Sequence, residues 1–166
     1  MTKLIVLSGV PGSGKSYFSQ TLKKMRRKHV YIVSSDGLRK EILNDQKDVS
    51  AEDLVWKFFY SLPKLYVDDK DAFVILDATH INSNKRIAIY NEFKDIFDEI
   101  DLVAFALDKD LVRHQNIERD FPVPIDVLEM FYESYEAPTK EEKEIFNNVY
   151  LIDTNDIVPV IYDLMK

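Results

Sequence analysis

The stretch that decides the fold of this chain is GVPGSGKS, at residues Gly9–Ser16. It fits the pattern G-x-x-x-x-G-K-[ST] at every fixed position, between an apolar run and a segment with helical spacing. Glycines let a backbone turn tightly, and successive N–H groups then form a nest for an anion. The helix that follows adds its positive dipole end. The stretch therefore predicts a loop that binds phosphates.

This pattern assigns a role to each fixed position. Lys15 is expected to reach the β- and γ-phosphates of ATP as a catalytic residue, and the Ser16 hydroxyl to bind Mg²⁺. The alternative is a glycine-rich turn that binds nothing. Three of the chain's four glycines lie in this one turn, which argues against an accident of composition. The residues expected to bind the nucleotide here are Gly9, Gly12, Ser13, Gly14, Lys15 and Ser16.

Continuous apolar runs alternate with longer segments of helical spacing. Runs without polar alternation indicate strands that are buried on both faces, as in a parallel sheet. The expected strands are Lys3–Ser8, Val30–Ser34, Ala72–Asp77, Asp101–Leu107 and Val149–Ile152. The expected helices are Ser13–Lys28, Asp36–Asn44, Ser50–Tyr66, Asn84–Glu99, Pro124–Tyr135 and Val158–Met165. Ser50 is expected to cap its helix, Pro63 to kink or end it, and Thr139 to open a capping box.

Strands that alternate with helices predict a doubly wound α/β fold. We expect one P-loop kinase domain over residues 1–166, with a central, mostly parallel sheet of four to five strands flanked by helices, and a helical lid. In such sheets the active site lies beyond the carboxyl ends of the strands.

Composition narrows the class of protein. No run of eighteen apolar residues exists, which predicts no membrane span, and the absence of cysteine excludes a thiolate site and favours a cytoplasmic location. The formal net charge of −7 argues against a protein that coats nucleic acid. It does not exclude an enzyme that grips one end of a strand in a small basic pocket.

Asp36 and Arg39 follow the second expected strand. A carboxylate at a strand end can accept the proton of an attacking hydroxyl or hold water on Mg²⁺. Arg39 stands three residues on, on the same helix face, where a guanidinium can bind an acceptor. The alternative is that Asp36 only caps a helix at Gly37–Leu43.

Asp77, Thr79 and His80 follow the third expected strand. Asp77 is favoured as a group near Mg²⁺ over a cap of the next turn, and Thr79 could reach the phosphates or an acceptor. A lone histidine is usually structural, and this reading is favoured for His80. Arg119 follows the fourth expected strand, either as a lid arginine that neutralises the transferred phosphoryl group or as an ordinary surface residue.

Together these motifs resemble the 5′-kinase domain of phage-type polynucleotide kinases and the related bacterial end-repair kinases. The resemblance covers roughly residues 3–136 and includes the phosphate loop and the Asp-x-x-Arg pair. It also includes Asp77-Ala-Thr-His-Ile-Asn followed by Lys85-Arg86, and Asn116-x-x-Arg119 leading into VPIDVL at residues 123–128. In the phage-like pattern an acidic residue directly precedes the threonine, whereas Ala78 does so here.

The resemblance implies site roles. Asp36 would be the general base, Arg39 would contact the acceptor end, and Arg119 would be the lid arginine on the phosphates of ATP. Asp77 and Thr79 match the strand-end pair and are taken as substrate-binding residues. Arg113 is a second candidate for a lid arginine.

The implied activity is that of a polynucleotide 5′-hydroxyl kinase, which transfers the γ-phosphate of ATP to a 5′-OH end of RNA or DNA. The chain has no room for a 3′-phosphatase domain, which implies a ligase or phosphatase partner in end repair. Two alternatives stay open: a P-loop kinase of a sugar, nucleoside or antibiotic, and a nucleotide-binding switch with slow turnover. The choice between RNA and DNA, the donor base and the oligomeric state are also open.

Overall fold

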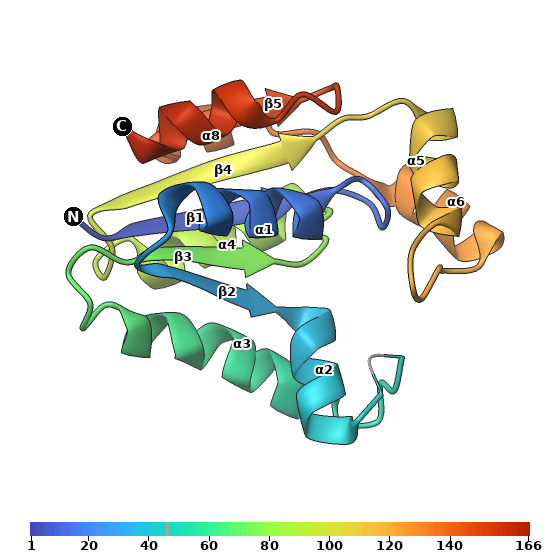
Figure 1. The fold of residues 1–166 in the computed structure, drawn as a ribbon, viewed down its shortest axis with the longest axis horizontal. Coiled ribbons are helices and arrows are strands. Elements are labelled where there is room, and N and C mark those ends of the chain that lie inside the picture. Colours follow the sequence, from blue (N-terminus) through green and yellow to red (C-terminus); the bar gives the residue numbers. More distant parts are fainter. Residues whose placement is uncertain (46) are drawn as a thin grey trace.

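Five parallel strands form one sheet at the centre of the molecule (Figure 1). The computed structural model describes residues 1–45 and 47–166. The strand order is β2-β3-β1-β4-β5, so the strand that leads into the phosphate loop lies in the middle. This confirms the predicted P-loop α/β fold. The strands are β1 (Lys3–Ser8), β2 (Val30–Ser34), β3 (Phe73–Asp77), β4 (Glu99–Phe105) and β5 (Asn148–Ile152).

Helices cover both faces of the sheet, with α1 and α8 on one face and α3 and α4 on the other. Within the described residues, none of the helices has the length and apolar character needed to cross a lipid bilayer. The helices are α1 (Lys15–Arg26), α2 (Ser35–Leu43), α3 (Glu52–Tyr66), α4 (Ser83–Phe93), α5 (Lys109–Ile117), α6 (Ile125–Ser134), α7 (Lys140–Ile145) and α8 (Val158–Met165).

Strand β1 shows why its sequence is apolar throughout. Leu4 and Val6 belong to the core on the α3–α4 side, whereas Ile5 and Leu7 belong to the core on the α1–α8 side. Successive side chains of a strand point to opposite faces, so a strand covered on both sides needs apolar residues at every position. All four of these side chains are fully buried.

The predicted helix Asn84–Glu99 is too long, because α4 ends at Phe93 and Glu99 already begins β4. The cause is an apolar pair that keeps helical spacing beyond the helix. Phe97 lies in a turn, where its N–H donates to the Phe93 carbonyl at 3.1 Å. The rings of Phe93 and Phe97 still pack edge to face, with their centroids 5.9 Å apart, and both are buried. The helical spacing of Phe93 and Phe97 therefore reflects their packing against each other beyond the end of α4, and not a longer helix.

The structure contradicts one prediction about α3 and one of the two alternatives of another. Ala51, not Ser50, is the N-cap, and it makes no side-chain capping bond. The Ser50 N–H instead donates to the Asp48 carboxylate at 2.8 Å, in a turn before the helix. The helix also does not end at Pro63, since it continues to Tyr66 with the proline ring buried.

Helices α5 and α6 form a lid beyond the carboxyl ends of the strands (Figure 1). The lid has a small core of its own, in which Val112 and Leu128 pack against Val10 of the phosphate loop. Asn116 fixes the turn between the two helices, because its side-chain amide donates to and accepts from the backbone of Val123 at 2.9 and 3.1 Å. The lid therefore rests directly on the loop.

A buried arginine anchors the chain where it leaves the lid. The Arg86 side chain is fully buried and forms an ion pair with the equally buried Glu142. Its other nitrogens donate to the His80 carbonyl at 2.9 Å and to the Glu136 carbonyl at 2.8 Å. Glu142 also closes the predicted capping box with Thr139, which is confirmed. One guanidinium thus ties the ends of the sheet to the segment after α6.

Candidate active site

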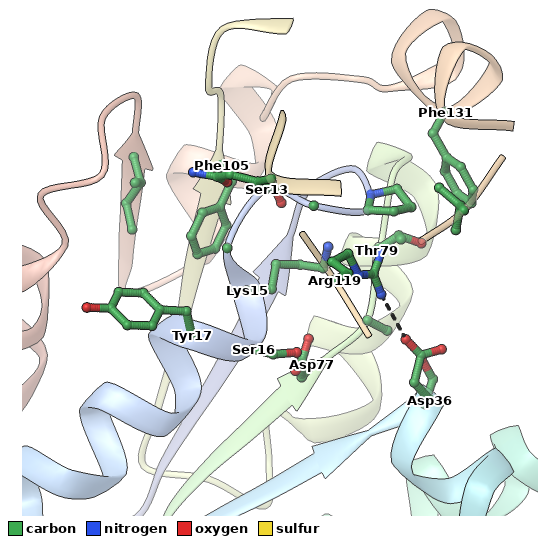
Figure 2. Close-up of a pocket in the computed structure, with 18 of the residues that line it drawn as sticks. Ser13, Lys15, Ser16, Tyr17, Asp36, Asp77, Thr79, Phe105, Arg119 and Phe131 are labelled. Atoms are coloured by element: carbon green, nitrogen blue, oxygen red, sulfur yellow. Dashed lines mark hydrogen bonds and ion pairs between the residues drawn. The ribbon is translucent and has the colours of Figure 1, made fainter. Parts of the chain in front are cut away.

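A cavity of about 680 Å³ opens at the carboxyl ends of the strands, between the phosphate loop, α2 and the lid. The loop, the strand ends and the lid each contribute part of its wall, as Figure 2 shows. Lys15, Ser16, Asp36 and Arg119 all line it, so residues from separate predicted motifs meet in one place. This is the position that the doubly wound topology predicts for a ligand.

Two glycines of the phosphate loop have left-handed backbones that other residues adopt only with strain. At Gly14, with φ +97°, a Cβ atom would meet nothing within 4 Å, so the loop borders open space there. At Gly12, with φ +82°, a Cβ would lie 3.0 Å from the Val112 carbonyl of α5. Gly14 therefore leaves a hollow of the kind that phosphates fill, and Gly12 lets the lid approach the loop.

Lys15 is buried, and its ammonium group donates to the carbonyls of Gly9 and Val10, each at 2.9 Å. The pKa of Lys15 is lowered to about 8, chiefly by burial and in part by the positive charge of Arg119. The carboxylates of Asp77 and Asp36 act in the opposite direction. A lysine held in this way is pre-positioned for an anion, which would raise its pKa again.

The Ser16 hydroxyl donates to the Asp77 carboxylate at 2.9 Å. Burial raises the pKa of Asp77, while the charge of Lys15 and the bond from Ser16 lower it. In the described chain no backbone N–H reaches this carboxylate, so Asp77 does not cap the turn that follows β3. A hydroxyl beside a carboxylate at the end of a phosphate loop fits Mg²⁺, which takes few protein oxygens and completes its shell with phosphate and water.

Asp36 is the second residue of α2 and does not cap that helix. The N-cap is Ser34, whose hydroxyl accepts the Gly37 N–H at 3.1 Å. The capping alternative for Asp36 is therefore wrong, and its side chain, 48% exposed, lines the cavity. One carboxylate oxygen lies 2.7 Å from Arg39 and the other 3.7 Å from Arg119.

Arg39 is more tightly engaged than its sequence suggested. Its guanidinium contacts both oxygens of Glu52, with Nε at 2.9 Å from the nearer one, and it also donates to Asp36. Glu52 is the first residue of α3, so this contact joins two helices. The bond to Glu52 raises the pKa of Arg39 and lowers that of Glu52. The structure thus makes Arg39 a brace for Asp36, beside its expected contact with an acceptor.

Arg119 lies two residues beyond α5 and reaches over the cavity toward Asp36 (Figure 2). Its second terminal nitrogen is buried without a hydrogen-bond partner, as suits a group that awaits an anion. Arg113 points elsewhere: it pairs with Glu129 of α6 and does not line the cavity. Of the two predicted lid arginines, only Arg119 is at the site.

Thr79 and His80 have different surroundings. Thr79 lines the cavity, and its carbonyl accepts the N–H of Gly9 at 2.9 Å. His80 is buried behind the loop, with Nδ1 at 2.6 Å from the Leu7 carbonyl. Burial lowers the pKa of His80 to about 4, so the ring is neutral at physiological pH. Its position fits the structural role favoured from the sequence.

Several cavity-lining residues belong to no motif in the sequence, among them Trp56 of α3, Gln115 of α5 and Phe131 of α6. Trp56 is the chain's single tryptophan, which was the one available signal. The Gln115 amide donates to Asn155 at 2.9 Å, which connects the lid to the loop after β5. All three reach the cavity only because distant helices pack around it.

Comparison with known families agrees with this geometry. Residues 4–138 match the family described as an AAA domain (AAA_33). The chain belongs to this family. With the phosphate loop, the all-parallel sheet and the lid, this AAA domain is an ATP-binding P-loop kinase domain.

The curated proteins that are similar to this AAA domain include the following two. Protein kti12 of Schizosaccharomyces pombe is 32% identical over 146 residues, which is 81% of this chain and 52% of that protein. The L-seryl-tRNA(Sec) kinase of Methanococcus maripaludis is 29% identical over 168 residues, which is 97% of this chain and 65% of that protein. The chain thus spans about half of the first relative's length and just under two thirds of the second's.

Among solved structures, Chaetomium thermophilum Kti12 in complex with ADP-AlF3 is similar in fold. The TM-score is 0.73 at 19% sequence identity, with 98% of this chain and 96% of that chain covered. The likeness extends over the whole sheet and its helices and supports the fold alone.

Proposed function

We propose that the chain transfers the γ-phosphate of ATP to a hydroxyl group, with Asp36 as the general base. The observation that carries this proposal is the position of Asp36. Its carboxylate lines the same cavity as the phosphate loop and lies 3.7 Å from Arg119, without capping a helix. A carboxylate that faces a triphosphate site can orient a hydroxyl and accept its proton during in-line attack.

In the proposed reaction the acceptor oxygen forms a bond to the γ-phosphorus while the bond to the bridging oxygen of ADP breaks. The hydroxyl proton passes to the Asp36 carboxylate. Lys15 and Arg119 stabilise the charge on the transferred phosphoryl group, and the loop N–H groups hold the β-phosphate. Ser16 and Asp77 would hold Mg²⁺, which neutralises phosphate charge when bound.

For the acceptor we propose the 5′-hydroxyl end of RNA or DNA, as the resemblance in the Asp36–Arg39 and Asn116–Arg119 segments implies. One relative is named as a kinase of L-seryl-tRNA(Sec), an acceptor carried on a nucleic acid. A second hollow borders Asp36 and Arg119 and extends past Lys40 and Phe121. An acceptor that reaches Asp36 therefore need not fit wholly inside the first cavity. A ligase or phosphatase partner in end repair remains part of this proposal.

A small-molecule acceptor is the second candidate, and two observations favour it. Glu52 and Asp36 already occupy the guanidinium of Arg39, the residue expected to bind a polynucleotide phosphate. The neighbouring hollow also contains Glu118 and Asp120, which would repel a phosphate backbone. A nucleoside or sugar meets neither difficulty.

A phosphoryl-transfer assay distinguishes the two candidates. Oligoribonucleotides and oligodeoxyribonucleotides with a 5′-hydroxyl are compared with free nucleosides and sugars, all with ATP and Mg²⁺. Oligonucleotides with a 5′-phosphate serve as the blocked control, and Lys15→Ala as the inactive enzyme. Labelling of the 5′-hydroxyl ends is the expected result. Labelling of small acceptors alone would leave the second candidate, and transfer to no hydroxyl would refute both.

A further inference from the structure

The strand order divides the cavity into two sides. The phosphate loop follows the central strand β1, with the ends of β2 and β3 on one side and those of β4 and β5 on the other. Asp36 and Thr79 follow β2 and β3, whereas Phe105 ends β4 (Figure 2). If the γ-phosphate faces Asp36, the nucleoside of ATP must lie on the β4–β5 side. The β2–β3 side is then the acceptor side.

Trp56 is the large aromatic residue of the acceptor side. It belongs to α3, packs against the core on that face of the sheet, and lines the cavity. Phe131 of α6 lines the same cavity and is directed from the lid toward it (Figure 2). Ligand pockets are commonly lined by aromatic side chains, and Trp56 is only partly buried, so part of it remains accessible from the cavity.

The indole ring of Trp56 is held in place before any acceptor arrives. It packs edge to face on Phe59 at 4.9 Å and lies nearly parallel to Tyr60 at 6.0 Å. Trp56 lies close enough to Glu52 to lower the pKa of that carboxylate, after the larger effect of Arg39. A fixed ring loses little conformational entropy when a ligand stacks on it. Trp56 is therefore a neighbour of the Glu52–Arg39 pair, and Arg39 in turn donates to Asp36.

The charges on the acceptor side favour binding of the acceptor by stacking over binding through ion pairs. Arg39 is already paired with two carboxylates, and the chain as a whole is acidic. Stacking on an aromatic side chain binds any nucleobase without a surplus of positive charge, because every base has a π-face. Trp56 therefore supplies an attraction that the ion pairs of the site do not.

We propose that Trp56 is the stacking platform for a planar ring on the acceptor, so that the substrate is a nucleoside or a nucleic-acid end whose base lies on the indole. This inference rests on the proposed function and narrows it, since it disfavours sugars without a base. The expected selectivity is for the presence of a base and not for its identity.

The test uses two 5′-hydroxyl oligonucleotides that differ only in the base of the first residue, which is present in one and absent in the other. Because Trp56 is the single tryptophan, the indole fluorescence of the wild-type protein reports on that position. We expect the intact oligonucleotide to quench it and the abasic one to bind about tenfold more weakly. In kinase assays the abasic end should have about tenfold higher KM with a similar kcat.

Variants make the assignment specific. Trp56→Leu should raise KM about tenfold for the intact oligonucleotide and leave the abasic one unchanged, while Trp56→Phe should retain most of the selectivity. Phe58→Leu, on the same helix but 44% exposed and outside the cavity, is the matched control. Thermal unfolding of each variant checks that it folds.

The outcomes separate this inference from the proposed function. Equal KM values for the two oligonucleotides, or a Trp56→Leu enzyme that still prefers the intact one, would overturn the stacking platform but keep the kinase. Phosphorylation of neither oligonucleotide would overturn the polynucleotide acceptor. In that case, fluorescence quenching by free adenosine but not by ribose would still support the platform.

Discussion

The Ser16 hydroxyl and the Asp77 carboxylate meet at 2.9 Å, although 61 positions separate them in the chain. Asp77→Asn keeps the shape of the side chain but removes the negative charge that would bind Mg²⁺. We expect nucleotide affinity in the presence of Mg²⁺ to fall about tenfold and affinity without the metal to stay within about twofold. Calorimetric titration with ADP, with and without Mg²⁺, measures both values. Asp163→Asn, remote from the cavity, is the control, and an equal loss under both conditions would contradict the assignment.

Asp36→Asn tests the general base. The amide cannot accept the acceptor's proton, so kcat should fall by about 10²- to 10⁴-fold. ATP affinity should change little, because Asp36 lies beyond the phosphate loop. Pre-steady-state quench-flow with saturating ATP measures the chemical step. Asp120→Asn, which lines the neighbouring hollow, should retain near-normal turnover. If Asp36→Asn also did so, Asp36 would not be the base.

The lowered pKa of Lys15 leads us to expect that nucleotide binding depends on pH. In the free protein its pKa is about 8, and bound phosphates would raise it by favouring the charged form. Affinity should therefore be constant below about pH 8 and fall above it, by up to about tenfold per pH unit. Titration with ADP between about pH 7 and 9.5 shows the trend. Lys15→Met should bind weakly with a flat profile over that range, and a wild-type profile equally flat would refute the coupling.

The lowered pKa of His80 leads us to expect that the free energy of unfolding depends on pH. Its pKa is about 4 in the folded chain, against 6.5 for an ordinary histidine. The unfolded chain therefore takes up the proton first as pH falls. The free energy of unfolding should be fully retained above pH 6.5 and decline between 6.5 and about 4, by about 3 kcal/mol in total. Urea titrations across that range measure how the free energy of unfolding depends on pH. This dependence should be weaker in His80→Gln and unchanged in the exposed His114→Gln.

Arg86 and Glu142 predict a large loss of stability when only one partner is removed. Arg86→Met leaves a buried carboxylate without its counter-charge, which should lower the free energy of unfolding by about 3–5 kcal/mol. Lys85→Met, the exposed neighbour, should change it by less than about 0.5 kcal/mol. Replacing both members, in Arg86→Met with Glu142→Met, should recover part of the loss. An additive double variant would mean that the pair has no coupling.

The sequence was sufficient to predict those parts of the structure that are determined by residues close together in the chain. The continuous apolarity of β1 and the glycine spacing of the loop determine their own structures, and the parallel topology then brings Asp36 and Asp77 to one edge of the sheet. Arg39 shows where local reasoning fails. Its partner Glu52 begins a different helix, and nothing in the Asp-x-x-Arg spacing announces that contact. Trp56 reaches the cavity for the same reason, through the packing of α3 against the sheet.

The contacts of Arg86 have a mechanical consequence. The same side chain holds the strand ends below the phosphate loop and the backbone at Glu136, where the chain leaves the lid. A movement of α5 and α6 would therefore leave the backbone at Glu136 joined to the strand ends for as long as these bonds persist. This anchor is buried, out of reach of solvent.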